Sequence, residues 1–307
     1  MGRDLLNEMR RLSLDDGESI FFARELEHIL SRQFNIEYPE LRARMFIPVS
    51  NEAGPGAESI TYYQFDQVGM AKLISDYSSD LPKVDVFGDK FTSPVESLGV
   101  AFGWSIQEVQ SAAMAGRSLT TMKANTARRA HEQRVDEIAA LGDANTGMVG
   151  MLNNANVPVG SALNGSWALA TPDQILEDLN ESVQTIINTS NNVESPDTVL
   201  LPPAEYAIIN QRRLGDTETT VLKFFLANNP WIRNVDHWYR LNGAGAGATQ
   251  RMVTYRRSPD KLELQIPKEF ETLPVQERGL MFEVPTHSRI GGVTVYKPLS
   301  LLYRDGI

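Results

Sequence analysis

The alternation of apolar and polar positions divides the chain into a strand-rich first part, a helical middle and a mixed second part. Residues 57–104 show no helical period and are rich in β-branched and aromatic residues, which predicts the two extended arms of a hairpin. In the next segment, Ser105 and Glu108 form an S-x-x-E capping box. Gly142 follows the last apolar residue, so we expect one long helix from Ser105 to Leu141.

The expected hairpin has more aromatic surface than a two-stranded sheet can bury. An isolated hairpin is marginally stable in water, so this one must lie against another surface. At about 1.5 Å per residue, the expected helix would span about 54 Å, roughly the diameter of a compact globule of this chain length. A chain built on such a helix leaves surface for neighbours. The hairpin residues expected at intersubunit contacts are Tyr62, Tyr63, Phe65, Tyr77, Phe87 and Phe91.

The two ends of the chain give shorter signals. Residues 1–40 contain an amphipathic helical pattern with few apolar residues, which indicates an arm that docks on the body or on a neighbour. In residues 41–56, the run MFIPV predicts a short strand, and Pro48 confines it to a sheet edge. Residues 279–307 return to strand patterns, which suggests that the chain comes back to complete its first domain.

Residues 145–278 alternate between helical and strand patterns, which indicates a mixed α/β layer. Thr171 and Gln174 form a T-x-x-Q capping box with Pro172 at the first helical position, so a helix to about Ser190 is expected. The run DTVLLP predicts a buried strand. Further helices and strands are expected at Pro203–Arg213, Thr217–Asn228, WIRNVDHWYRL, RMVTYRR and KLELQIP.

Composition excludes several classes of function. The 307 residues are enough for about two domains, and 42% are hydrophobic. The absence of cysteine excludes disulfides, thiolate metal sites and cysteine nucleophiles. The net charge of −10 and the scattered basic pairs argue against a general nucleic-acid binder. No apolar run approaches the roughly 18 residues of a membrane span, so we expect no membrane partner.

No motif assembles a catalytic, cofactor or metal site. The four histidines do not form H-E-x-x-H, and no nucleophile, base and orienting group occur together. The run Gly243–Gly247 lacks the preceding strand and following helix of a dinucleotide-binding turn, so a flexible or close-packed loop is the better interpretation. His237 and Trp238, in VDHWYR, are interpreted as packed or interfacial, and we include both among the expected intersubunit contacts.

The order of these parts resembles the major capsid proteins of tailed bacteriophages, which have the Hong Kong 97-type fold. The stretch HEQRVDEIAALGDANTGMVGMLNNANVP resembles the end of that fold's spine helix and the entry into its second domain. The stretch TPDQILEDLNESVQTIINTSNNVESPDTVLLPPAEYAIIN resembles the helix, strand and P-x-x-Y segment that follow. The resemblance covers nearly the whole chain and implies an α+β fold.

The resemblance also implies a division of the chain. It assigns an N-terminal arm, a peripheral-domain strand, an extended E-loop hairpin, a spine helix in the peripheral domain, an axial domain, and C-terminal strands that complete the peripheral domain. Their ranges would be 1–40, 41–56, 57–104, 105–144, 145–278 and 279–307. Gly-rich junctions at Gly142–Gly150 and Gly243–Gly247 would absorb differences between six-fold and five-fold rings.

The function implied is that of a structural protein. Copies would form the hexamers and pentamers of an icosahedral shell, assembled in the host cytoplasm as the capsid of a virion. The shell would enclose double-stranded DNA without sequence-specific binding, with scaffolding, portal and decoration proteins as further partners. One alternative is an encapsulin-type cellular compartment of the same fold. Another is an α/β enzyme, which the absence of a catalytic constellation disfavours.

Overall fold

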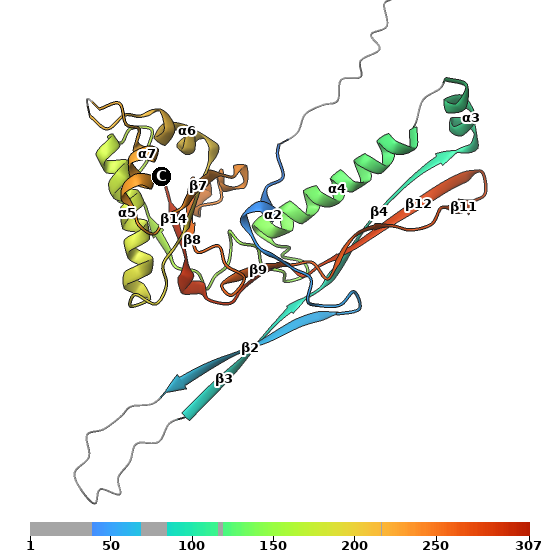
Figure 1. Ribbon diagram of the computed structural model, residues 1–307. Coiled ribbons are helices and arrows are strands. Elements are labelled where there is room, and N and C mark those ends of the chain that lie inside the picture. Colours follow the sequence, from blue (N-terminus) through green and yellow to red (C-terminus); the bar gives the residue numbers. More distant parts are fainter. Residues whose placement is uncertain (1–38, 69–84, 116–118, 216) are drawn as a thin grey trace, which may run out of the picture. The chain divides into compact units, whose positions relative to one another are not determined.

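The computed structural model describes residues 39–68, 85–115, 119–215 and 217–307, and the expected helix within the N-terminal arm lies outside them. The chain divides into two units, 1–40 and 41–307. The second unit contains all the helices and strands that Figure 1 labels. Their mixture agrees with the α+β class predicted from the sequence.

The largest sheet is mixed, and its central strands are buried on both faces. Every residue of its strands β6, β8 and β14 is buried, as expected for strands such as TVLL that read as continuous apolar runs. The outer strands β5 and β7 run parallel to their neighbours, whereas β8 is antiparallel to both of its own. In spatial order the strands are β5 (Val159–Ser161), β14 (Leu301–Asp305), β8 (Arg251–Tyr255), β6 (Thr198–Leu201) and β7 (Asn234–His237).

Three helices share a core with this sheet. Helix α5 (Pro172–Thr189) begins at the predicted capping box, where both reciprocal hydrogen bonds are present. Its buried side chains, with those of α6 (Pro203–Gln211) and α7 (Val221–Asn228), pack against residues of the sheet and around Trp167. The indole N–H of Trp167 donates to Asp178 of α5 at 2.9 Å. The predicted helices and the buried strand of this region are therefore present, but the helix predicted from Thr217 begins at Val221.

A second sheet has four strands and is built on one long antiparallel pair. Strand β12 (Met281–Ile290) pairs along its whole length with β4 (Glu96–Ser105). On its other edge β12 pairs with β10 (Lys268–Thr272) and β11 (Gln276–Arg278). Helix α4 contacts both β4 and β12.

The range predicted as one helix contains two. Helix α3 (Ile106–Ala115) begins at the predicted capping box, in which Ser105 and Glu108 exchange hydrogen bonds of 3.1 Å. Helix α4 (Leu119–Leu141) is a separate element, so the prediction of a single helix is wrong. Residues 116–118, which include Gly116 with its low helix propensity, lie outside the described residues.

Helix α4 ends where the sequence predicts. Gly142 has a φ of +69°, and a Cβ at this position would overlap the carbonyl oxygen of Met148. A Cβ at Gly150 would likewise overlap the carbonyl oxygen of Ala140. The glycines at both ends of the proposed 142–150 junction therefore permit close backbone packing. At Gly247, in contrast, a Cβ would meet nothing within 4 Å.

The remaining strands form a small sheet and the hairpin. Strand β9 (Leu262–Gln265) pairs with β1 (Val49–Ser50) and β13 (Val293–Val295). Before β1, the residues Ala43–Phe46 form the short helix α2, in which Phe46 is a core residue. The prediction of a strand through MFIPV is therefore wrong for residues 45–48, and only Val49 belongs to a strand. The short 3-10 helices are η1 (Tyr239–Leu241), η2 (Ala246–Ala248) and η3 (Pro298–Ser300).

Strand pairing corrects three of the predicted boundaries. The predicted hairpin, 57–104, ends early: β2 (Ser59–Val68) pairs with β3 (Asp85–Pro94), but the following β4 pairs with β12. Strands β10 and β11, assigned by resemblance to the axial domain, pair with β12 as well. Strand β14, assigned to the peripheral domain, lies between β5 and β8 in the five-stranded sheet. A strand pattern in the sequence predicts extended backbone, but the strand with which it pairs is determined by residues far away in the chain.

Candidate subunit-contact surface

The hairpin β2–β3 has two faces of different character. Because successive side chains of a strand point to opposite faces, Tyr62 and its cross-strand partner Phe91 lie on one face, and Tyr63 and its partner Lys90 lie on the other. The first is called the inner face, because it contacts residues of the chain itself. The second is called the outer face.

Aromatic contacts hold the inner face. The rings of Tyr62 and Phe91 stack with centroids 5.1 Å apart, and Tyr296 meets Tyr62 edge-on at 4.9 Å. The hydroxyl of Ser93 donates to the carbonyl oxygen of Gly291 at 2.9 Å. Burial raises the pKa of Tyr62, so its phenol stays neutral at ordinary pH. The base of the hairpin is thus bound to the segment that contains β13.

The outer face is apolar and open. Tyr63 is 63% exposed, Phe65 is 66% exposed, and Val86 on the opposite strand is 60% exposed. Gly88 lies opposite Phe65, and a Cβ there would come within 3.1 Å of the Phe65 ring, so the glycine leaves room for that ring. Side chains of this size gain about 1.5–3 kcal/mol each when they are buried, which this face leaves unused within the chain.

The predicted contact residues of the hairpin differ in their surroundings. Tyr63 and Phe65 lie on the outer face, whereas Tyr62 and Phe91 contact the chain's own residues. Phe87 belongs by its backbone to β3, and Tyr77 lies outside the described residues.

The two other predicted contact residues, His237 and Trp238, differ in their burial. His237 is half-buried and lies against Tyr206, with ring centroids 5.1 Å apart. Trp238 is 0% exposed and packs against Phe46 at 5.7 Å, so its prediction as a contact residue is wrong. An aromatic residue beside a strand has the same sequence signal in a core and at an interface.

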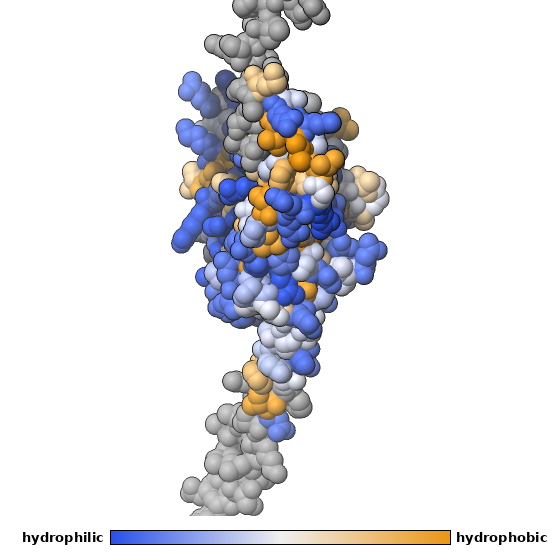
Figure 2. All heavy atoms as spheres, turned by 90° about the vertical axis from the view of Figure 1, so that its right-hand side faces the viewer, coloured by the Kyte–Doolittle hydropathy of each residue, from blue (hydrophilic) through white to orange (hydrophobic). Residues whose placement is uncertain are grey.

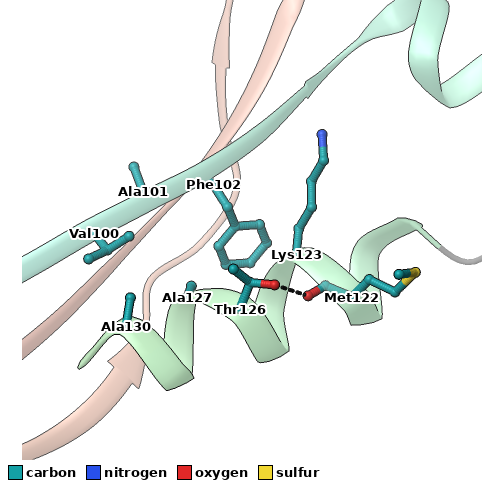
Figure 3. A pocket seen from close by; sticks show the side chains of 8 residues that line it. All are labelled: Val100, Ala101, Phe102, Met122, Lys123, Thr126, Ala127 and Ala130. Atoms are coloured by element: carbon teal, nitrogen blue, oxygen red, sulfur yellow. Dashed lines mark hydrogen bonds between the residues drawn. The ribbon is translucent and has the colours of Figure 1, made fainter. Parts of the chain in front are cut away.

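An apolar groove lies between strand β4 and helix α4. Its volume is about 410 Å³, and Figure 3 shows Phe102 of β4 above Ala127 and Thr126 of α4. Lys123 stands beside it, and its ammonium donates to the carbonyl oxygen of Gly103 at 2.7 Å and pairs with Glu108 at 3.3 Å. The lining residues are Val100, Ala101, Phe102, Met122, Lys123, Thr126, Ala127 and Ala130. Small side chains make this surface accessible to apolar groups from outside.

A third apolar surface could not be recognised from the sequence. Figure 2 shows apolar atoms on the side of the molecule where α3 and the β11–β12 turn lie in Figure 1. Met114 of α3 is 93% exposed, Leu280 beside the turn is 78% exposed, and Val275 is 54% exposed. These residues are not aromatic, and within a strand or helix pattern they look like core positions. Only their exposure distinguishes them.

No chemistry of another kind gathers in the part of the chain that the structure describes. Within it, no group of three or more His, Cys, Asp or Glu residues is placed to hold a metal ion. None of the described helices combines the length and apolar character needed to cross a membrane. The described surface does offer apolar side chains and a groove, which are typical of contacts between proteins.

An open apolar face and a groove are typical of a protein that associates with other subunits. The model of the family described as Major capsid protein matches residues 69–307, and the chain belongs to that family. It is a capsid shell protein, and the resemblance found in the sequence is confirmed at the level of family and fold. No curated protein matches the chain.

Solved structures agree with this fold. The capsid of Myoviridae phage XM1 matches with a TM-score of 0.83 at 22% identity, over 93% of this chain and 98% of that one. The Mycobacterium phage Adephagia structure matches with a TM-score of 0.64 at 12% identity, over 92% and 95%. A virus-like particle from Pyrococcus furiosus matches with a TM-score of 0.57 at 14% identity, over 85% and 91%.

Proposed function

We propose that copies of this chain form the hexamers and pentamers of an icosahedral shell that encloses double-stranded DNA. The observation that carries the proposal is the outer face of the hairpin, on which Tyr63 and Phe65 are each about two-thirds exposed. A fold common to phage capsids supports the closed shell. The net charge of −10 suits a container that holds DNA without binding its sequence.

Within this proposal the hairpin acts as the E-loop and α4 as the spine helix. The outer face would pack onto an apolar surface of a neighbouring subunit, and the groove between β4 and α4 has the size and lining to receive such side chains. Each contact can be weak, because many contacts in one shell raise the effective affinity. The five-stranded sheet with α5, α6 and α7 would form the axial domain, which now includes β14.

The virion capsid is the location that the family supports, and we propose assembly in the host cytoplasm with scaffolding, portal and decoration proteins. The likeness to the virus-like particle favours one second candidate for the function, an encapsulin-type compartment. The two differ in cargo. Nuclease-protected DNA in particles from infected cells supports the capsid, whereas particles that hold a cargo protein and no DNA support the compartment.

The test of the contact surface is assembly of a double variant, Tyr63→Ser with Phe65→Ser. We expect soluble subunits that fail to form closed particles under conditions in which the unchanged chain forms them, as seen by negative-stain microscopy. The matched control is Gln64→Ser with Asp89→Ser, a cross-strand pair of exposed residues on the opposite face of the same hairpin. Normal particles from the Tyr63/Phe65 variant would refute the role of the outer face.

A further inference from the structure

His131 of α4 is a buried titratable side chain that none of the surfaces above uses. It is 3% exposed. Its Nδ1 lies 3.0 Å from Oγ of Ser288, and its Nε2 lies 3.0 Å from Oγ1 of Thr286, both on strand β12. The ring also meets Phe270 of β10 edge-on, with centroids 4.8 Å apart. One imidazole therefore joins the helix to two strands of the four-stranded sheet.

The hydrogen bonds fix which ring nitrogen carries the proton. The hydroxyl of Thr286 donates to the carbonyl oxygen of Val100 on β4, and a carbonyl oxygen can only accept. Thr286 must therefore accept from His131, so Nε2 carries the hydrogen. In the neutral ring Nδ1 is then an acceptor, and it receives the hydroxyl hydrogen of Ser288. The result is one directed chain of bonds from Ser288 through His131 and Thr286 to Val100.

Protonation of the ring breaks this series of hydrogen bonds at one point. The second proton would sit on Nδ1 and would point at Ser288, which then could no longer donate there. Ser288 is 5% exposed, and among the described residues its hydroxyl has no partner besides His131. A buried hydroxyl hydrogen without an acceptor is costly, so the site opposes the charged ring.

The acidic groups near the ring are already paired with basic side chains. Burial lowers the pKa of His131, Glu132 beside it on α4 raises it, and His287 on β12 lowers it again. Glu132 is bound by Arg44 of α2 at 3.0 Å, which offsets its influence. On β10, Glu269 also pairs with Arg44, and Lys268 pairs with Glu271 at 2.7 Å. Between Glu96 and Ser105, strand β4 has no ionisable residue.

We propose that His131 is an acid-sensitive latch that holds α4 against β12 and β4 while its ring is neutral and loosens this junction when the ring takes up a proton. The ligand of the site is the proton itself. Because α4 lines the apolar groove together with β4, release of the latch also alters that groove. The inference concerns the fold of the single chain and stands whether or not the hairpin makes the proposed contacts.

The direction of the pH effect is set by proton linkage. The folded chain binds the proton less readily than an unfolded histidine, whose pKa is about 6.5. The stabilisation is therefore complete above that pH and is lost as the pH falls from about 7 toward the lower folded value. We expect the folded-to-unfolded ratio of the full chain to fall several-fold over this range through His131 alone. Amides of α4 should lose protection in hydrogen exchange over the same range.

The test compares variants of the full chain in the same assembly state. His131→Gln should flatten the pH dependence of the unfolding midpoint between pH 7.5 and 5, and Ser288→Ala should weaken it while leaving the histidine in place. Ser288→Ala also keeps the test decisive if His131→Gln does not fold. His237→Gln, on β7 of the other sheet, should retain the unchanged chain's pH dependence. Equal pH dependence in the unchanged chain and Ser288→Ala, with protection of α4 constant across pH, would overturn the proposal.

Discussion

The five-stranded sheet and the hairpin are both rich in apolar strand residues, but they use them in opposite ways. All residues of β6, β8 and β14 are buried. In the hairpin the strands are fully paired to each other, yet Tyr63 and Phe65 stay about two-thirds exposed. The difference is that helices and loops cover the sheet on both faces, whereas a two-stranded ribbon has only one covered face at its base.

The buried sheet stabilises the folded chain, whereas the exposed face of the hairpin would stabilise the assembled shell. Apolar surface stabilises only when it leaves water. In the sheet that transfer is complete within one chain. On the outer face of the hairpin, the apolar side chains leave water only when another surface covers them. Substitutions there should therefore affect assembly far more than folding.

The largest expected effect is in the core beside the sheet. Trp238→Ala removes a fully buried indole and should lower the free energy of unfolding by about 3–5 kcal/mol, because the cavity cannot close completely. Trp231→Ala, at a side chain that is 41% exposed, is the matched control and should cost much less. Denaturant unfolding of dissociated subunits measures both, and equal losses would contradict the assignment of Trp238 to the core.

The next effect distinguishes two glycines with nearly the same positive φ. Gly142 and Gly247 have φ of +69° and +68°, but only at Gly142 would a Cβ overlap another backbone group. Gly142→Ala should therefore cost about 2–4 kcal/mol, and Gly247→Ala about 1–2 kcal/mol from conformation alone. Thermal unfolding of the two variants checks this order. A reversed order would show that residues 142–150 are not tightly packed.

A smaller effect separates the two faces of the hairpin. Tyr62→Ala removes contacts with Phe91 and Tyr296 and should cost about 1–3 kcal/mol of local stability, seen as faster amide exchange in β3. Tyr63→Ala should change the exchange of dissociated subunits by less than about 0.5 kcal/mol. Similar exchange rates in both variants would mean that the inner face does not anchor the hairpin.

The last contrast is one of pH dependence and concerns the buried ion pair at the end of β14. Burial alone would raise the pKa of Asp305, but the hydrogen bonds from Arg251, at 2.7 Å, and from the backbone of Ala246 outweigh it and lower the pKa. The stabilisation is present above the ordinary value of about 4 and is lost as the pH falls through the folded value.

Asp305→Asn should therefore remove part of the acid destabilisation below about pH 4, measured by acid titration of circular dichroism. Asp89→Asn, an exposed carboxylate of the hairpin, serves as the control and should leave the acid transition in place. An Asp305→Asn transition identical to that of the unchanged chain would show that this ion pair adds nothing to acid stability.

Local signals in the sequence predicted much of the fold. The capping boxes at Ser105 and Thr171 set the starts of α3 and α5, because the bonds that cap a helix lie within four residues. The partner of β4 could not be predicted in this way, since β12 lies about 180 residues later in the chain. Trp238 failed as a contact residue for a related reason: burial depends on Phe46, far away in sequence.

The most direct measurement is hydroxyl-radical footprinting of the hairpin in dissociated subunits and in assembled particles. Tyr63 and Phe65 should be oxidised readily in subunits and protected several-fold in particles, while Tyr62 changes little between the two states. Equal oxidation of Tyr63 and Phe65 in subunits and particles would contradict the claim that this face is completed by a neighbouring copy.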